Sequence, residues 1–138
     1  MIGCGNRRVK KLTLDNNWEW GELVTLDHDP NCGADITHDL EELPWPVAAD
    51  SFDEVHAYEV LEHLGSQGDA KSFFAHFGEI YRVLKPGGLL LATVPALVKR
   101  SGPSKATIAT TQGEILSRAG MACSHKSIVG CTPPGLMP

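Results

Sequence analysis

The chain has 138 residues, a formal net charge of −5 and four cysteines. This length allows one domain with one core, and no apolar run approaches the ~20 residues that a membrane-spanning helix needs. A negative charge without a basic stripe argues against a stand-alone nucleic-acid-binding protein. The cysteines form no CxxC pair, which argues against a zinc ribbon or a thioredoxin-type site and favours reduced thiols in a cytoplasmic protein; they are Cys4, Cys32, Cys123 and Cys131. The N-terminus leads directly into glycines, so we expect no signal peptide.

The first motif is a glycine loop, Gly3-Cys4-Gly5-Asn6. In a doubly wound fold, glycines after the first strand let the backbone approach a ligand closely. Only Met1 and Ile2 precede the loop, so the strand that should lead into it is nearly absent. Taken alone, the motif fits an ordinary glycine turn better than a ligand loop.

Two short strands follow, and each ends in a carboxylate. Glu22–Asp27 reads ELVTLD and is followed by His28. An acidic residue about 20 positions past the glycines is where such folds hold a ribose diol, which favours Asp27, or Asp29 if the register shifts by two. Ala34–Leu40 reads ADITHDL and ends at Asp39, which also suits the N-cap of a turn. We expect Trp45 to pack on the sheet and Trp18 and Trp20 to cover the edge of the core.

The central stretch predicts a strand, a helix and a second strand. Phe52–Tyr58 is rich in β-branched and aromatic residues. Asp69 suits an N-cap, and Pro86-Gly87-Gly88 suits a helix stop before a buried strand at Leu89–Val94. Between them, apolar residues at helical spacing form one face: Phe73, Phe77, Ile80, Tyr81 and Leu84. Strand, helix and strand in one sheet form a parallel crossover, which predicts an α/β, doubly wound, mostly parallel sheet.

The stretch from Phe52 to Pro95 resembles the class I S-adenosylmethionine-dependent methyltransferases, because FDEV, VLEHL and LKPGG occur in that order at the family's spacing. The match covers roughly residues 2–95. It implies a Rossmann-like methyltransferase fold, reduced at both ends, with S-adenosylmethionine as the cofactor. Two positions depart from the family pattern: Met1 stands where an acidic residue is usual, and Arg7 where a third glycine is common. By position, the resemblance assigns to the cofactor Gly3, Cys4, Gly5, Asp27, His28, Asp39, Leu40 and Tyr58.

A cluster of the E-x-x-E-H type follows the central strand, formed by Glu59, Glu62 and His63. Two carboxylates and an imidazole on one turn suit a divalent cation, and a subset of methyltransferases resembles this arrangement. The same VLEHL run also occurs in relatives without metal, so we expect no required metal. Glu59 and His63 are the candidates for a general base, if the acceptor needs one.

The last third of the chain carries fewer signals. We expect a mobile loop at residues 96–110 and a helix at Gln112–Met121. A further strand is expected at Met121–Val129, and an irregular tail at Cys131–Pro138. We therefore expect a single domain over 1–138, with a cofactor-binding core at 1–95 and a loop, helix and tail at 96–138.

The expected function is S-adenosylmethionine-dependent methyl transfer to an unidentified acceptor. One alternative is a binding or interaction module that has lost catalysis. A weaker one is an NAD-dependent oxidoreductase, which would need a glycine where Arg8 stands. An unfilled central slot in the sheet could be relieved by minimal pairing of Met1 and Ile2, by another segment, or by a second chain; of these we expect a homodimer.

Overall fold

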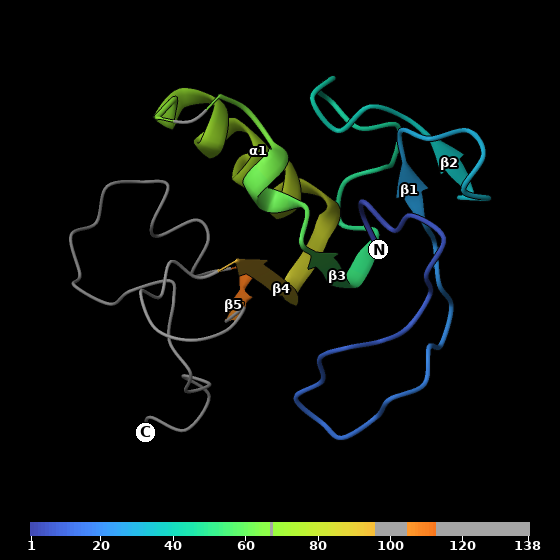
Figure 1. Cartoon of the computed structure of the whole chain (residues 1–138). Helices are drawn as coiled ribbons and strands as arrows, with labels where there is room; N and C mark the ends of the chain where they lie inside the picture. The colour runs from blue at the N-terminus through green and yellow to red at the C-terminus, as the bar shows by residue number, and fades with distance from the viewer. Residues whose placement is uncertain (67, 96–104, 113–138) are drawn as a thin grey trace, which may run out of the picture.

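A computed structural model gives the structure of residues 1–66, 68–95 and 105–112. Five strands form its sheet: β1 (Leu26–Asp27), β2 (Ile36–Thr37), β3 (Phe52–Tyr58), β4 (Leu84–Pro95) and β5 (Lys105–Thr111). The spatial order is β2, β1, Ile2, β3, β4, β5, and only β5 is antiparallel to its neighbour. The described residues also contain one α-helix, α1 (Ala70–Val83), and a 3-10 turn, η1 (Leu61–His63). The predicted α/β fold with a mostly parallel sheet is confirmed, in a reduced form (Figure 1).

Ile2 fills the place of the missing first strand. It forms parallel bridges to Leu26 and Ala57, and its side chain is buried. Its N–H donates to the His56 carbonyl at 3.0 Å, and the next N–H, of Gly3, donates to the Leu26 carbonyl at 2.8 Å. The minimal pairing considered above is therefore the arrangement that the protein adopts. The argument for a homodimer from an unfilled slot no longer holds, and a homodimer stays a prediction.

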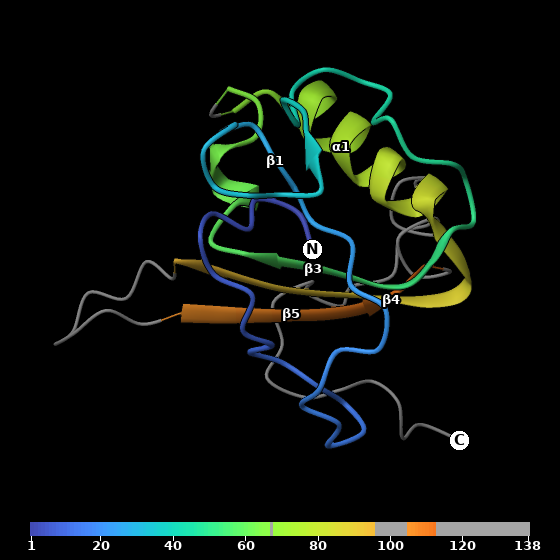
Figure 2. The same cartoon turned by 90° about the vertical axis from the view of Figure 1, so that its right-hand side faces the viewer.

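Helix α1 lies across one side of the sheet (Figure 2). Asp69 is its N-cap, as predicted, because its carboxylate accepts hydrogen bonds from the N–H groups of Lys71 and Ser72. The buried side of the helix carries Phe77, Ile80 and Val83, which join Val55 and Ala57 of β3 in one core. Phe73 was predicted on this side but is 44% exposed, since it lies in the first turn, where the helix extends past the core.

The helix ends at Val83, earlier than predicted, and β4 begins at Leu84. Pro86-Gly87-Gly88 therefore does not stop the helix but lies within β4, where the register with β3 shifts between Phe52 and Glu54. Gly87 has a φ of 79°, which a residue without Cβ adopts at little cost. Beyond this irregularity, residues 90–93 are buried on both faces, as the sequence predicts for an internal strand.

The prediction of a loop over 96–110 is wrong for its last part, because Lys105–Thr111 forms β5. The segment KATIATT contains β-branched residues, which favour a strand once a partner edge is present. β4 supplies that edge, with Leu91 opposite Ala109. Gln112 then anchors the end of β5, since its side-chain amide donates to the carbonyls of Tyr81 and Leu84 at 3.1 and 2.7 Å. The predicted helix beyond Gln112, the strand at 121–129 and the tail lie outside the described residues.

An irregular segment, residues 6–20, runs along the side of the sheet opposite α1 (Figure 2). Trp20 packs edge-on against His56 with 4.8 Å between the ring centroids, and its indole N–H donates to the Arg8 carbonyl. Trp18 is 56% exposed, so its predicted place over the core is wrong. Trp45 is buried, as predicted. No helix in the described ranges has the length and apolar character needed to cross a membrane.

The first two predicted strands are shorter than their sequence patterns. ELVTLD yields a strand only at Leu26–Asp27, and ADITHDL only at Ile36–Thr37. Thr25 directly precedes β1, and Asp35 directly precedes β2. The Asp35 carboxylate accepts hydrogen bonds from both the N–H and the hydroxyl of Thr25 at 2.8 Å, so this N–H is not available for pairing between strands. This side-chain clamp fixes the start of the β1–β2 pair.

Replacing the helix cap tests its contribution to stability. We expect Asp69→Ala to lower the free energy of unfolding by about 1 kcal/mol, because two N–H groups of the first turn lose their acceptor. Asp69→Asn keeps a capping oxygen and should retain most of that stability. Urea denaturation of the three proteins measures the difference, and equal stability of wild type and Asp69→Ala would contradict the capping role.

Candidate functional site

A pocket of about 730 Å³ lies where the parallel strands end. The segments that follow Ile2, β1, β2 and β3 all contribute to it, because parallel strands bring their carboxyl ends to one edge of a sheet. Its volume falls within the roughly 300–1,000 Å³ of ordinary small-molecule sites. Among the described residues its lining consists of Gly3, Gly5, Asp27, His28, Asp29, Pro30, Asp39, Leu40, Glu41, Glu59, Val60, His63 and Leu64.

Asp27 is the most buried carboxylate of this lining, at 5% exposure. One oxygen accepts the N–H of Gly5 at 2.8 Å, and the other accepts the N–H of Asp29 at 2.9 Å. Burial alone would raise the pKa of Asp27, but these two hydrogen bonds and the nearby His28 outweigh it and hold the pKa below its usual value. The site therefore presents an ionised carboxylate that is fixed from both sides.

The glycine loop forms part of the wall of the pocket, through Gly3 and Gly5. Gly3 and Gly5 have φ angles of 58° and 52°, in the left-handed region where glycine is unstrained. A Cβ on Gly3 would collide with Val60, whose own Cβ would be only 2.8 Å away, whereas a Cβ on Gly5 would meet open space. Gly3 thus allows a close approach between the loop and the segment after β3, and Gly5 supplies a donor to Asp27.

Asp39 and Leu40 follow β2 in the chain and line the pocket. The Asp39 carboxylate accepts the N–H of Glu41 at 2.9 Å, so it caps the following turn, as one of the two predictions for it required. Asp39 is nevertheless exposed and lines the pocket, which leaves it able to accept a further hydrogen bond. Leu40 is buried, and its carbonyl accepts the indole N–H of Trp45 at 3.0 Å.

The E-x-x-E-H cluster divides between two pockets. Glu59 and His63 line the site, whereas Glu62 lines a neighbouring pocket beside Phe73 and Phe77. Glu62 and His63 approach each other to 3.7 Å. Within the described part of the chain, the three side chains of this cluster are not gathered at metal-ligand distance. Glu59 has a φ of 55°, a strained conformation for a residue with Cβ, and such strain often occurs at functional sites.

Two residues assigned to the cofactor from the sequence do not line the pocket. Tyr58 faces the opposite side of the sheet, where its hydroxyl accepts the N–H groups of Lys11 and Leu12 at 3.0 and 3.2 Å. Strand alternation explains this direction, since Tyr58 shares a face with His56 and not with Ala57. Cys4, within the glycine loop, has a buried side chain close to that of Cys32.

Four lining residues carry no site signal recognised in the sequence: Pro30, Glu41, Val60 and Leu64. Val60 and Leu64 are part of VLEHL, so their apolar character could have identified them as a wall of the site. Glu41 is placed by a longer-range contact, since its carboxylate accepts the N–H of Gly65. No local signal in the sequence reports such a contact.

The two glycines form a matched pair for mutation. Both alanine variants place a Cβ at positive φ, which costs about 1–2 kcal/mol. Gly3→Ala also collides with Val60, so we expect it to lose about 1–3 kcal/mol more than Gly5→Ala. Urea denaturation gives the comparison, and equal losses would contradict the close approach at Gly3.

A family model described as a methyltransferase domain matches residues 1–92. A search of curated proteins found no match. The matched range covers two thirds of the chain and includes the glycine loop, Asp27, Asp39 and the VLEHL segment that surround the pocket. The chain belongs to the class I S-adenosylmethionine-dependent methyltransferase family.

Proposed function

We propose that this chain binds S-adenosylmethionine in the pocket at the carboxyl ends of the strands and transfers its methyl group to an acceptor. The observation that carries the proposal is Asp27, a buried and ionised carboxylate held by the N–H groups of Gly5 and Asp29. An ionised carboxylate only accepts hydrogen bonds, so it suits the two hydroxyls of a ribose.

The remaining lining residues suit the other parts of an adenosyl cofactor. Asp39 and the backbone at Leu40 supply an acceptor and a donor for the edge of an adenine ring. Gly3 and Gly5 let the backbone lie against the ligand. His28, which is exposed beside Asp27, borders the ribose position.

The charge of the pocket favours this cofactor over a dinucleotide. Five carboxyl side chains line it, Asp27, Asp29, Asp39, Glu41 and Glu59, and its described lining contains neither lysine nor arginine. A pyrophosphate would meet like charge there, whereas the positive sulfonium of S-adenosylmethionine is attracted. This argues against the NAD-dependent oxidoreductase.

When bound, the sulfonium supplies the driving force for methyl transfer, and the protein supplies position and exclusion of water. Glu59 and His63 are the lining residues able to accept a proton from an acceptor, if the acceptor needs a base. His63 is exposed, so it borders the entrance where an acceptor would arrive. A module that binds the cofactor without turnover remains the alternative.

Asp27→Ala tests the cofactor site. We expect it to weaken binding of S-adenosylhomocysteine by about 1.5–3 kcal/mol, the scale of a charge-assisted hydrogen-bond site. Asp29→Ala distinguishes the ribose position from its neighbour, and Asp53→Ala, an exposed carboxylate paired with Lys85 at 3.3 Å, is the matched control. Isothermal calorimetry measures the affinities, and circular dichroism checks each fold.

Unchanged affinity in Asp27→Ala would refute the assignment. A titration with NAD in the same calorimeter addresses the oxidoreductase, which tight NAD binding would favour. Turnover of S-adenosylmethionine with a panel of acceptors separates the methyltransferase from the binding module.

A further inference from the structure

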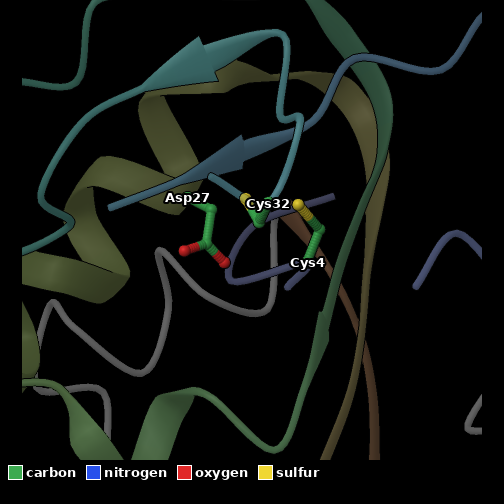
Figure 3. Close-up of side chains that lie close together, drawn as sticks. All are labelled: Cys4, Asp27 and Cys32. Carbon is green, nitrogen blue, oxygen red and sulfur yellow. The ribbon is translucent and has the colours of Figure 1, made fainter. Parts of the chain in front are cut away.

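Three potential metal ligands meet beside the glycine loop: Cys4, Asp27 and Cys32 (Figure 3). They come from three separate segments, namely the glycine loop, the end of β1 and the turn that follows it. Their ligand atoms all lie within 4.8 Å of one another. All three residues are buried, at 7%, 5% and 8% exposure. The VLEHL cluster has no comparable convergence within the described residues.

We propose that Cys4, Asp27 and Cys32 form a binding site for a thiophilic divalent cation of the Zn²⁺ type. Two thiolates and a carboxylate are a ligand set that zinc accepts. Zinc–sulfur bonds of about 2.3 Å and zinc–oxygen bonds of about 2.0–2.2 Å place tetrahedral ligand atoms about 3.5–3.8 Å apart. Since no two ligand atoms are more than 4.8 Å apart, the separations need to close by at most about 1 Å, and three protein ligands leave the fourth position to a water molecule.

The surrounding loops hold the ligands in place. Arg8 joins the two cysteine-bearing segments, because its guanidinium donates to the Gly5 carbonyl at 2.7 Å and to the Cys32 carbonyl at 3.2 Å. The N–H of Cys32 donates to the Asp29 carbonyl at 3.3 Å, which closes the second turn. A divalent cation with two thiolates and one carboxylate has a net charge of −1, and the Arg8 cation lies next to both loops to offset it.

The same carboxylate serves both sites. Asp27 already accepts two backbone hydrogen bonds, and a cation bound to one of its oxygens would take lone pairs and negative charge that the ribose hydroxyls need, although neither cysteine lines the pocket itself. Zinc and the cofactor therefore compete. This competition rests on the proposed function, whereas the cation site itself does not.

Cobalt titration tests the cation site. The background is the Cys123→Ser, Cys131→Ser double variant, in which Cys4 and Cys32 are the remaining cysteines. After reduction, Co²⁺ should produce a thiolate-to-cobalt charge-transfer band that Zn²⁺ abolishes. We expect Cys32→Ser in this background to lose the band, and Asp27→Asn to keep it with weaker cobalt affinity. Absence of the band in the reduced background protein, or its persistence in Cys32→Ser, would overturn the site.

A second measurement uses the wild-type chain, so its result does not depend on whether the cysteine variants fold. In the wild-type chain, Zn²⁺ should slow alkylation of Cys4 and Cys32 relative to Cys123 and Cys131, as mapped by mass spectrometry. Equal rates with and without zinc at Cys4 and Cys32 would count against the proposal.

The competition between zinc and the cofactor is tested by the affinity for S-adenosylhomocysteine. Zn²⁺ should lower the affinity for S-adenosylhomocysteine in wild type and leave it unchanged in Cys32→Ser. An unchanged affinity in wild type would remove the competition. A chain that binds cobalt but no S-adenosylhomocysteine would keep the cation site while the proposed function fails.

Discussion

Ile2 and the residues on either side of it join the two parts of the sheet that the structure describes, because the Gly3 N–H and the Met1 carbonyl bond to Leu26 of β1. The N–H of Ile2 reaches the His56 carbonyl of β3, and its bridge to Leu26 joins β1 to the same sheet. Unpaired backbone groups in a buried slot would each cost about 1–3 kcal/mol, so this short pairing is what allows β1–β2 and β3–β4–β5 to act as one scaffold. The glycine loop begins at the next residue. Its position at the site is therefore fixed by the pairing of Ile2.

The glycine loop and the end of β1 hold each other in position through Asp27. Gly5 donates to Asp27, and Asp27 in turn also holds Asp29, so the carboxylate belongs to the backbone geometry as much as to the pocket. The two hydrogen bonds keep the pKa of Asp27 low despite its burial. This charge is thus available at neutral pH without a lysine or arginine in the described lining of the pocket. A pocket of this kind attracts cations and donors and repels phosphates.

Because Cys4 and Cys32 lie close to Asp27, the negative charge of Asp27 can also contribute to the proposed cation site. A buried cysteine by itself behaves as a small apolar side chain. Two thiols and a carboxylate from separate segments, linked by Arg8, form a ligand set instead. Both sites depend on the same loop, so a change that shifts Gly5 or Arg8 would alter them together.

The sequence by itself determined the family, the α/β class, the N-cap at Asp69, the strand at Phe52–Tyr58, and the placement of Asp27 and Asp39 at strand ends. The family follows from the resemblance of FDEV, VLEHL and LKPGG to known methyltransferases, and the other features follow from periodicity, capping and spacing, which depend on residues close together in the chain. Only the tertiary structure decided that Ile2 fills the central slot, that Lys105–Thr111 forms β5, that Tyr58 faces Lys11 and Leu12, and that Cys4 meets Cys32. Each of these depends on a partner that is distant in sequence, such as the free edge of β4 for β5. A local pattern contains no information about such a partner, because the contact energy exists only once the chain has brought both segments together.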